Sequence, residues 1–340
     1  MRHIVDIELT RRCNLSCSAC FVRAQPEPEA ELTTAQVIEV LDQLPLPACS
    51  VHLTGGEPFL HPGIWTILER SAAGRAASIV VNTNATLLAP HDLGRLGALG
   101  LPVLLLVSFD GPGEAHARSR GPGVAEAARA VLCAAPHHGV MASPASILTR
   151  ELLDHDLGRW HADIEGLLGR RPELVCFPLF LPPGRPTTSA DVGSPLAPAD
   201  LPRVADQIVA AHVGGRRISV IDFPLINPLL AMRGYPVGLM GPCDAGRGRF
   251  CVQADATLSP CHPSRHVLGH LGPGILKRLR RNPDHARLGL RSFSSCQGCA
   301  WLDLCGHCRA VVSGRGFPLF DDDGWCSALE CKRPLRHDSS

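Results

Sequence analysis

The stretch IVDIELTRRCNLSCSAC, residues 4–20, places an apolar and β-branched run directly before three closely spaced cysteines. The run Ile4–Thr10 is typical of a strand, and Cys13, Cys17 and Cys20 would follow it on one tight loop. In a parallel α/β domain, functional loops lie at the carboxyl ends of the strands. Three thiolates on one loop can hold three irons of a four-iron cluster and leave the fourth iron open for a small molecule.

The fifteen cysteines of this 340-residue chain fall into two groups. Three lie on the N-terminal loop and nine lie between Cys243 and Cys331, while the other three are expected to be ordinary buried side chains (Cys49, Cys133 and Cys176). So many thiols in a reducing compartment favour metal binding over disulfides. Zinc is the alternative metal for the N-terminal loop. It would need a fourth ligand, for which His3 and Cys49 are available without a paired spacing.

The chain from residue 4 to about 222 alternates short apolar runs with amphipathic helical stretches, and the strand spacing of roughly 25 to 45 residues predicts βαβ units in a parallel sheet. The expected strands are Ile4–Thr10, Ser50–Leu53, Ser78–Asn82, Val103–Ser108, Val140–Leu148, Leu174–Leu179 and, as a possible seventh, Ile218–Asp222. The expected helices include Thr34–Leu44, opened by a capping box of Thr33 and Gln36, and Ile64–Ala73, Val124–Ala135 and Leu201–His212. Six units are too few to close an eight-stranded barrel, so the fold class is α/β, with a partial (β/α)6 parallel barrel.

Composition changes after Gly234, where cysteines, glycines and short segments replace the regular alternation. We therefore predict a partial barrel over residues 1–234 and a small cysteine-rich domain over residues 235–340, with a long loop at Leu181–Pro198. The formal net charge of +1 argues against a nucleic-acid partner. No apolar run approaches the length of a membrane span. The N-terminus lacks a signal peptide, so a cytoplasmic location is expected.

The loop motif resembles the CxxxCxxC signature of the radical S-adenosylmethionine (radical SAM) enzymes, and further motifs follow in the order of that family. Gly55-Gly56-Glu57-Pro58 resembles the GGEP motif, whose glycines let the backbone approach a ligand and whose glutamate can accept from the methionine ammonium. The guanidinium of Arg120 is suited to the cofactor's carboxylate. The resemblance implies these cofactor-binding residues: Gly55, Gly56, Glu57, Pro58, Thr83, Asn84, Ser108, Asp110 and Arg120. Ala19 stands where the family usually has an aromatic residue, so either Phe21 takes over its packing or the contact with the adenine is weaker.

The C-terminal cysteines resemble the SPASM extension of the radical SAM enzymes, which holds up to two auxiliary iron–sulfur clusters. The resemblance assigns Cys296, Cys299, Cys305 and Cys326 to an outer cluster, and Cys243, Cys261, Cys308 and, as fourth ligand, Cys251 to an inner one. Cys331 is left over and could replace Cys326. A zinc ribbon is the alternative for Cys296–Cys308.

The resemblance implies an iron–sulfur oxidoreductase that reductively cleaves S-adenosylmethionine to a 5′-deoxyadenosyl radical, which abstracts a substrate hydrogen. The expected substrate is a peptide or protein that is oxidised or crosslinked, although the first strand leaves no room before it for a separate peptide-recognition domain. The alternative is oxidation, epimerisation or decarboxylation of a small natural-product precursor, such as a sugar, aminoglycoside, nucleoside or tetrapyrrole. A non-enzymatic iron–sulfur or zinc scaffold would not explain Gly55–Pro58 and Arg120.

Two further expectations concern electrons and protons. An external donor of the flavodoxin or ferredoxin type would reduce the first cluster. His262 directly follows Cys261, where sulfatase maturases carry a carboxylate that resembles a proton acceptor. Imidazole can accept a proton near neutral pH, so His262 is the candidate catalytic base.

Overall fold

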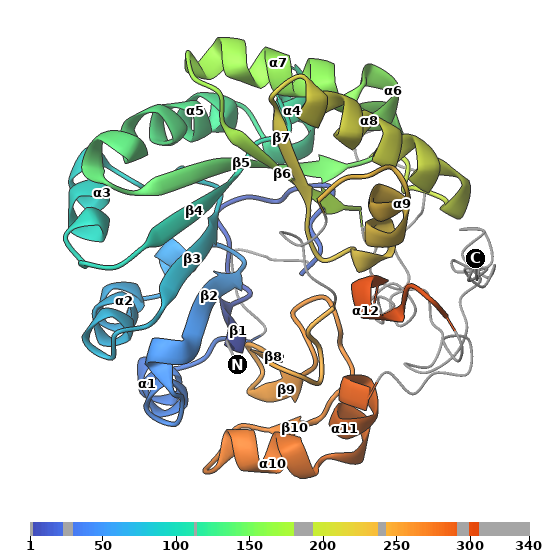
Figure 1. Ribbon diagram of the computed structural model, residues 1–340. Coiled ribbons are helices and arrows are strands. Elements are labelled where there is room, and N and C mark those ends of the chain that lie inside the picture. The colour runs from blue at the N-terminus through green and yellow to red at the C-terminus, as the bar shows by residue number, and fades with distance from the viewer. Residues whose placement is uncertain are drawn as a thin grey trace.

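The computed structural model describes residues 3–22, 30–111, 114–179, 193–236, 243–290 and 299–305. Its centre is one sheet with the strand order β10-β9-β8-β1-β2-β3-β4-β5-β6-β7, which curves around the middle of the molecule (Figure 1). The strands are β1 (His3–Thr10), β2 (Cys49–Gly55), β3 (Ser78–Thr83), β4 (Val103–Ser108), β5 (Met141–Leu148), β6 (Glu173–Pro178), β7 (Arg217–Val220), β8 (Arg249–Val252), β9 (Thr257–Ser259) and β10 (Gly269–His270). Strands β1 to β7 pair in parallel in chain order, and β8 pairs in parallel with the other edge of β1.

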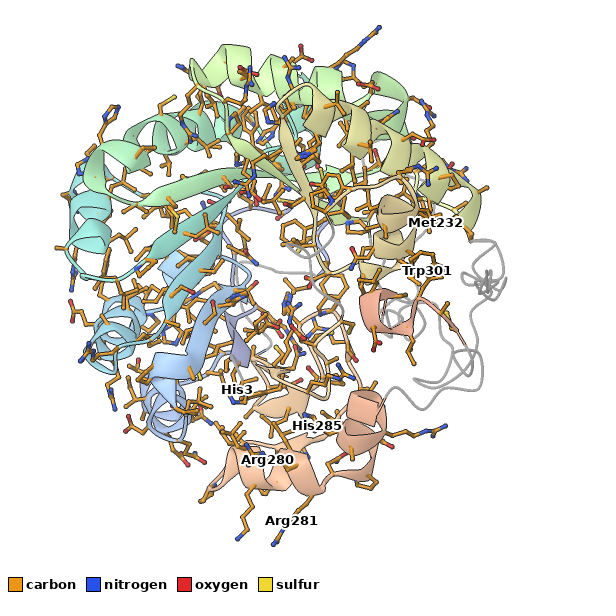
Figure 2. The ribbon with its side chains drawn as sticks, viewed as in Figure 1. His3, Met232, Arg280, Arg281, His285 and Trp301 are labelled. Atoms are coloured by element: carbon orange, nitrogen blue, oxygen red, sulfur yellow. The ribbon has the colours of Figure 1, made fainter. Side chains whose placement is uncertain are left out.

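Helices cover the outer face of this curved sheet (Figure 1). The helices of the described residues are α1 (Thr34–Asp42), α2 (Ile64–Ala73), α3 (Pro90–Gly97), α4 (Glu114–Arg120), α5 (Val124–Ala134), α6 (Arg150–His155), α7 (Leu157–Leu168), α8 (Leu201–Val213), α9 (Asn227–Met232), α10 (Ile275–Arg281), α11 (Pro283–Leu290) and α12 (Leu302–Cys305). Helix α12 packs against α9 at the open side of the molecule (Figure 1). Apolar side chains fill the space between sheet and helices, whereas Arg280 and Arg281 point outward from α10 (Figure 2). Among the described helices, none is both long and apolar enough to span a bilayer.

The alternation of side chains along β1 decides what faces the interior of the barrel. Val5, Ile7 and Leu9 are fully buried in the main apolar core. Successive side chains of a strand point to opposite faces, so Asp6 and Glu8 project from the inner face, and both are buried as well. The inner face therefore carries charge inside the fold.

Helix α1 shows how local sequence sets an element that the core then stabilises. The hydroxyl of Thr33 accepts a hydrogen bond from the Gln36 amide at 3.2 Å, and the Gln36 side chain accepts from the Thr33 amide at 2.8 Å. This capping box, predicted from the sequence, satisfies two backbone donors at the start of the helix. The helix then buries Val37, Val40 and Leu41 in the core.

The predicted α/β partial barrel is confirmed, and every expected strand is present with its ends shifted by at most about two residues. The possible seventh strand is β7. After Gly234 the sequence shows little helical periodicity apart from Ile275–Arg280, whereas the structure has a further helix, α11, directly after α10. Strand β8 joins the barrel sheet beside β1, so both expected domains contribute to one sheet, and the division at residue 234 stays a prediction. Most of the predicted loop Leu181–Pro198 lies outside the described residues.

Candidate active site

A cavity of about 460 Å³ lies among the inner faces and carboxyl ends of the strands. All three cysteines of the loop after β1 line it. The structure brings most of the predicted cofactor-binding residues to the same cavity: Gly55, Gly56, Thr83, Asn84, Ser108 and Arg120. The remaining three, Glu57, Pro58 and Asp110, are not among its lining residues. Motifs separated by up to a hundred residues in sequence therefore meet in one place.

The cysteine loop is fastened to the glycine motif after β2 by backbone hydrogen bonds. The Gly56 amide donates to the Thr10 carbonyl at 2.7 Å, and the Glu57 amide donates to the Arg12 carbonyl at 2.9 Å. Gly55 has φ +137°, and a Cβ atom there would lie 2.3 Å from the Thr10 carbonyl oxygen. Only glycine fits this close approach, so Gly55 fixes the distance between the two loops.

The thiols of the cysteine loop are wholly or partly buried at the cavity. Burial raises the pKa of the Cys13 thiol to about 11, and burial also raises the pKa of Cys17. A cluster's positive irons would favour the thiolate form that burial disfavours. Among the described side chains, no three His, Cys, Asp or Glu groups converge around one metal ion. Cys49, a possible fourth zinc ligand, instead donates to the Pro45 carbonyl at 3.2 Å.

Glu57 is buried behind the cavity wall and its carboxylate is already engaged. It accepts from the Thr83 hydroxyl at 2.9 Å, from the Asn84 amide at 2.8 Å and from the Phe59 amide at 3.2 Å. Burial raises the pKa of Glu57 to about 7. The sequence predicts that this carboxylate accepts from the methionine ammonium, whereas in the structure it joins the end of β2 to the end of β3.

Asp110 holds Arg120 in place beside the cysteine loop. The Arg120 Nε donates to Asp110 Oδ2 at 2.6 Å, and the Ile147 amide donates to Asp110 Oδ1 at 2.8 Å. The Arg120 side chain is only 11% exposed. The terminal guanidinium nitrogens carry further donors, as the fork geometry of arginine provides. Asp110 thus orients Arg120 from outside the cavity lining.

An ionic cluster that the sequence did not suggest also lines the cavity. Arg249 donates to Asp6 at 2.7 and 3.2 Å and to Asp222 at 2.5 Å. His52 Nδ1 lies 3.3 Å from Asp6 Oδ1. Burial of Asp6 is outweighed by Arg249 and His52, which hold the pKa of that carboxyl well below its usual range. Arg249 therefore ties β8 to β1 and to the segment after β7. The sequence signal that could have indicated this cluster is Asp6, an acidic residue at an inward position of an apolar strand.

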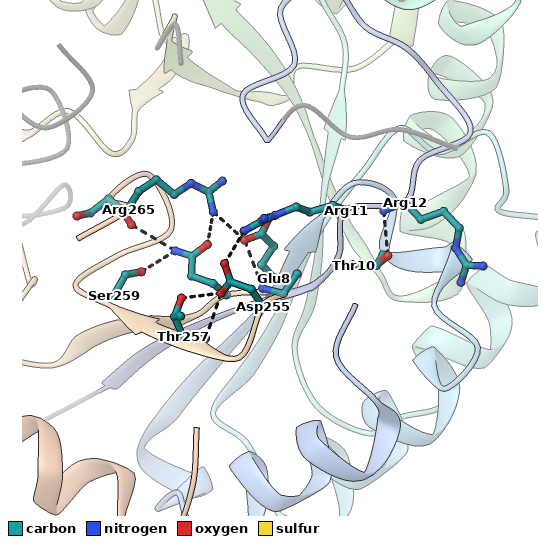
Figure 3. Close-up of polar contacts among 11 residues, drawn as sticks. Glu8, Thr10, Arg11, Arg12, Asp255, Thr257, Ser259 and Arg265 are labelled. Atoms are coloured by element: carbon teal, nitrogen blue, oxygen red, sulfur yellow. Dashed lines mark hydrogen bonds and ion pairs between the residues drawn. The ribbon is translucent and has the colours of Figure 1, made fainter. Parts of the chain in front are cut away.

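A second network connects β1 to the β8–β9 hairpin (Figure 3). Glu8 is fully buried and accepts from Arg11 at 3.1 Å and from Arg265 at 2.9 Å. The Arg265 guanidinium also lies 5.4 Å from the centre of the Phe21 ring. Phe21 lines the cavity and meets His262 edge-on at 5.8 Å between ring centres. The end of the cysteine loop is thus packed against the C-terminal part of the chain.

Several C-terminal cysteines that the sequence singles out lie near this cavity. Cys243 and Cys261 line it, and the Cys243 amide donates to the Cys305 carbonyl at 3.4 Å. Cys251 is fully buried on β8, and burial raises its pKa, with smaller contributions from Asp6, Glu8 and Cys261. Cys299 also lies in the described part. Four cysteines lie outside the described residues: Cys296, Cys308, Cys326 and Cys331.

His262 lies at the same wall, next to Cys261. It lines the cavity, and its Nε2 is buried without a hydrogen-bond partner among the described residues. Burial lowers the pKa of His262, against the opposing effect of Glu8. The structure thus places His262 where a substrate could be reached, and its role as a base stays a prediction.

A parallel partial barrel with three thiols on the loop after β1 suits an iron–sulfur enzyme, and comparison with known proteins supports this class. Residues 7–140 match the family model described as the Radical SAM superfamily. The chain is 29% identical over 332 residues to the mycofactocin maturase MftC of Mycobacterium ulcerans. This alignment covers 94% of this chain and 86% of that protein.

Solved structures support the fold at lower sequence identity. The structure of anSMEcpe with bound AdoMet and Cp18Cys peptide has a TM-score of 0.70 at 19% identity, covering 96% of this chain and 94% of that one. SuiB of Streptococcus suis bound to S-adenosylmethionine has a TM-score of 0.72 at 14% identity, covering 96% and 77%. Residues 7–140 therefore carry a radical SAM domain, and the chain is an iron–sulfur enzyme. The sequence resemblance is thereby confirmed, and with it an iron–sulfur cluster and S-adenosylmethionine as cofactors.

Proposed function

We propose that the chain is a radical SAM maturase that oxidises or crosslinks a peptide or protein substrate. The observation that supports this most is one cavity that is lined both by the cysteine loop and Arg120 and by Cys261 and His262. A substrate in this cavity would lie between a radical-generating site and candidate electron and proton acceptors. The maturases to which the chain is similar match it over nearly its whole length.

The residues for the first half of this chemistry are those at the carboxyl ends of β1 to β4. When bound to Cys13, Cys17 and Cys20, a four-iron cluster with S-adenosylmethionine supplies one-electron cleavage of a carbon–sulfur bond and a hydrogen-abstracting radical. The Gly55–Gly56 backbone lets the cofactor approach the strand end closely. Arg120, held by Asp110, would bind the cofactor's carboxylate, and Ser108 and Asn84 would face the cofactor across the cavity.

We further propose auxiliary clusters in the C-terminal part. Cys243, Cys251 and Cys261, with Cys308, would hold an inner cluster, and Cys296, Cys299, Cys305 and Cys326 would hold an outer one. The lining positions of Cys243 and Cys261 and the backbone contact between Cys243 and Cys305 support this arrangement. Such clusters would receive the electron that an oxidised substrate must lose, and a protein of the flavodoxin or ferredoxin type would reduce the first cluster.

A product assay under anaerobic conditions tests the peptide assignment. Reconstituted protein is incubated with S-adenosylmethionine, dithionite and a short peptide encoded beside its gene. We expect 5′-deoxyadenosine to form in proportion to loss of the peptide, with a product whose mass reports oxidation or crosslinking. Formation of 5′-deoxyadenosine at the same rate with and without peptide, and no change in peptide mass, would contradict the assignment and favour a small-molecule substrate.

A further inference from the structure

We propose that Asn84 sets the reduction potential of the first cluster by donating a hydrogen bond to the sulfur of Cys13. The inference rests on the proposed assignment of that cluster to Cys13, Cys17 and Cys20. Asn84 follows β3, is 6% exposed and places its Nδ2 at 3.8 Å from the Cys13 Sγ. This distance is within the range of hydrogen bonds to sulfur, so Asn84 is adjacent to a cluster ligand as well as to the cavity.

The orientation of the Asn84 amide is fixed by its other hydrogen bonds. Its Oδ1 accepts from the Thr86 amide at 3.0 Å and from the Thr86 hydroxyl at 2.7 Å. Its Nδ2 donates to the Asn14 Oδ1 at 3.0 Å, and the Asn14 Nδ2 in turn donates to the Thr86 hydroxyl at 2.8 Å. A reversed amide would turn its oxygen toward Asn14 Oδ1 and its NH2 toward the Thr86 amide, losing these bonds. The N–H group therefore faces the sulfur.

The backbone of Asn84 is held just as firmly, and here Glu57 acts as a positioning residue. Glu57 Oε2 accepts from the Asn84 amide at 2.8 Å, and Oε1 accepts from the Thr83 hydroxyl at 2.9 Å. The Leu15 amide provides a second donor to the Cys13 sulfur at 3.4 Å. The buried glutamate of the GGEP-like motif thus fixes the residue that contacts the cluster ligand.

Hydrogen bonds to cluster sulfurs change reduction potentials because they stabilise the more negative, reduced state. In a buried site such a bond is weakly screened by solvent. Loss of the Asn84 donor should therefore make one-electron reduction less favourable. Asn82 provides a matched comparison, since it lies near the end of β3, two residues before Asn84, and lines the same cavity but donates to the Thr54 hydroxyl at 3.3 Å.

The test is a redox titration of full-length reconstituted protein, followed by electron paramagnetic resonance of the reduced cluster. Added S-adenosylmethionine identifies the relevant signal, because only the cluster with an open iron should change its spectrum on binding it. We expect Asn84→Ala to make reduction about tenfold less favourable, a midpoint about 59 mV lower for a one-electron couple. Asn82→Ala should leave the midpoint unchanged.

A second variant keeps the test decisive if Asn84→Ala binds less iron. Asn84→Asp keeps the size of the side chain but replaces the donor by an oxygen, so its midpoint should also fall. A titration measures the reduced fraction of the clusters that are present, so partial loss of iron does not prevent the measurement. Midpoints equal to that of the unmodified protein in both Asn84 variants would overturn the inference. Absence of iron from the unmodified protein would instead refute the cluster assignment itself.

Discussion

Replacing Arg120 by lysine should weaken S-adenosylmethionine binding while the iron content stays constant. Arg120 uses Nε for Asp110 at 2.6 Å, which leaves its terminal nitrogens for a second anion in the cavity. A lysine has one ammonium group and cannot hold both partners with the planar fork of a guanidinium. The loss of one charge-assisted interaction is worth about 1–3 kcal/mol, a 5- to 150-fold increase in Kd.

Equilibrium binding of S-adenosylmethionine to the reconstituted variant measures this effect. Arg95→Lys is a suitable control, because Arg95 is half-exposed on α3 and pairs with Glu69 outside the cavity. We expect the control to bind as the unmodified protein does. An Arg120→Lys variant with full iron and unchanged affinity would show that Arg120 does not bind the cofactor's carboxylate.

Three further substitutions test other parts of the site. Gly55→Ala forces a Cβ against the Thr10 carbonyl, so less iron should be incorporated and Tm should fall; normal values for both would contradict the close approach. Glu57 has a raised pKa of about 7 in the folded protein, against about 4.3 in an unfolded chain. The folded state therefore binds the carboxyl proton of Glu57 more tightly than the unfolded state does. The resulting stabilisation is full below about pH 4.3 and is lost as pH rises through 7, by about 4 kcal/mol. Urea unfolding from pH 4.5 to 7 should show the unmodified protein losing stability relative to Glu57→Gln, and a constant difference would oppose this. If His262 accepts the substrate proton, His262→Ala should keep its iron and cleave S-adenosylmethionine yet lose most product; normal turnover would exclude that role.

The strands and the convergence of the motifs could be predicted from the sequence because both follow from local patterns. Alternating apolar runs such as Ile4–Thr10 mark strands, and loops at the carboxyl ends of parallel strands meet at one edge. The direction of a buried side chain was not predictable in the same way. Glu57 points behind the cavity wall because the path of its loop brings it to the Asn84 amide.

The ionic cluster that lines the cavity was also not predicted, because its residues are far apart in the sequence. Asp6 and Arg249 are separated by 243 residues, and nothing local indicates that β8 pairs with β1. Only the register of that pairing, which aligns Ile4 with Arg249 and Asp6 with Cys251, brings the guanidinium beside the carboxylate. A charged residue inside an apolar strand therefore indicates that an oppositely charged partner lies within the fold, but it does not identify that partner.

Iron content and S-adenosylmethionine cleavage, measured on the same anaerobically reconstituted protein, test most directly whether Cys13, Cys17 and Cys20 hold the reactive cluster. With three four-iron clusters the chain should carry about twelve irons. Replacing these three cysteines by alanine should remove about a third of the iron and abolish 5′-deoxyadenosine formation. A triple variant that keeps all of its iron, or that still cleaves S-adenosylmethionine, would contradict this assignment.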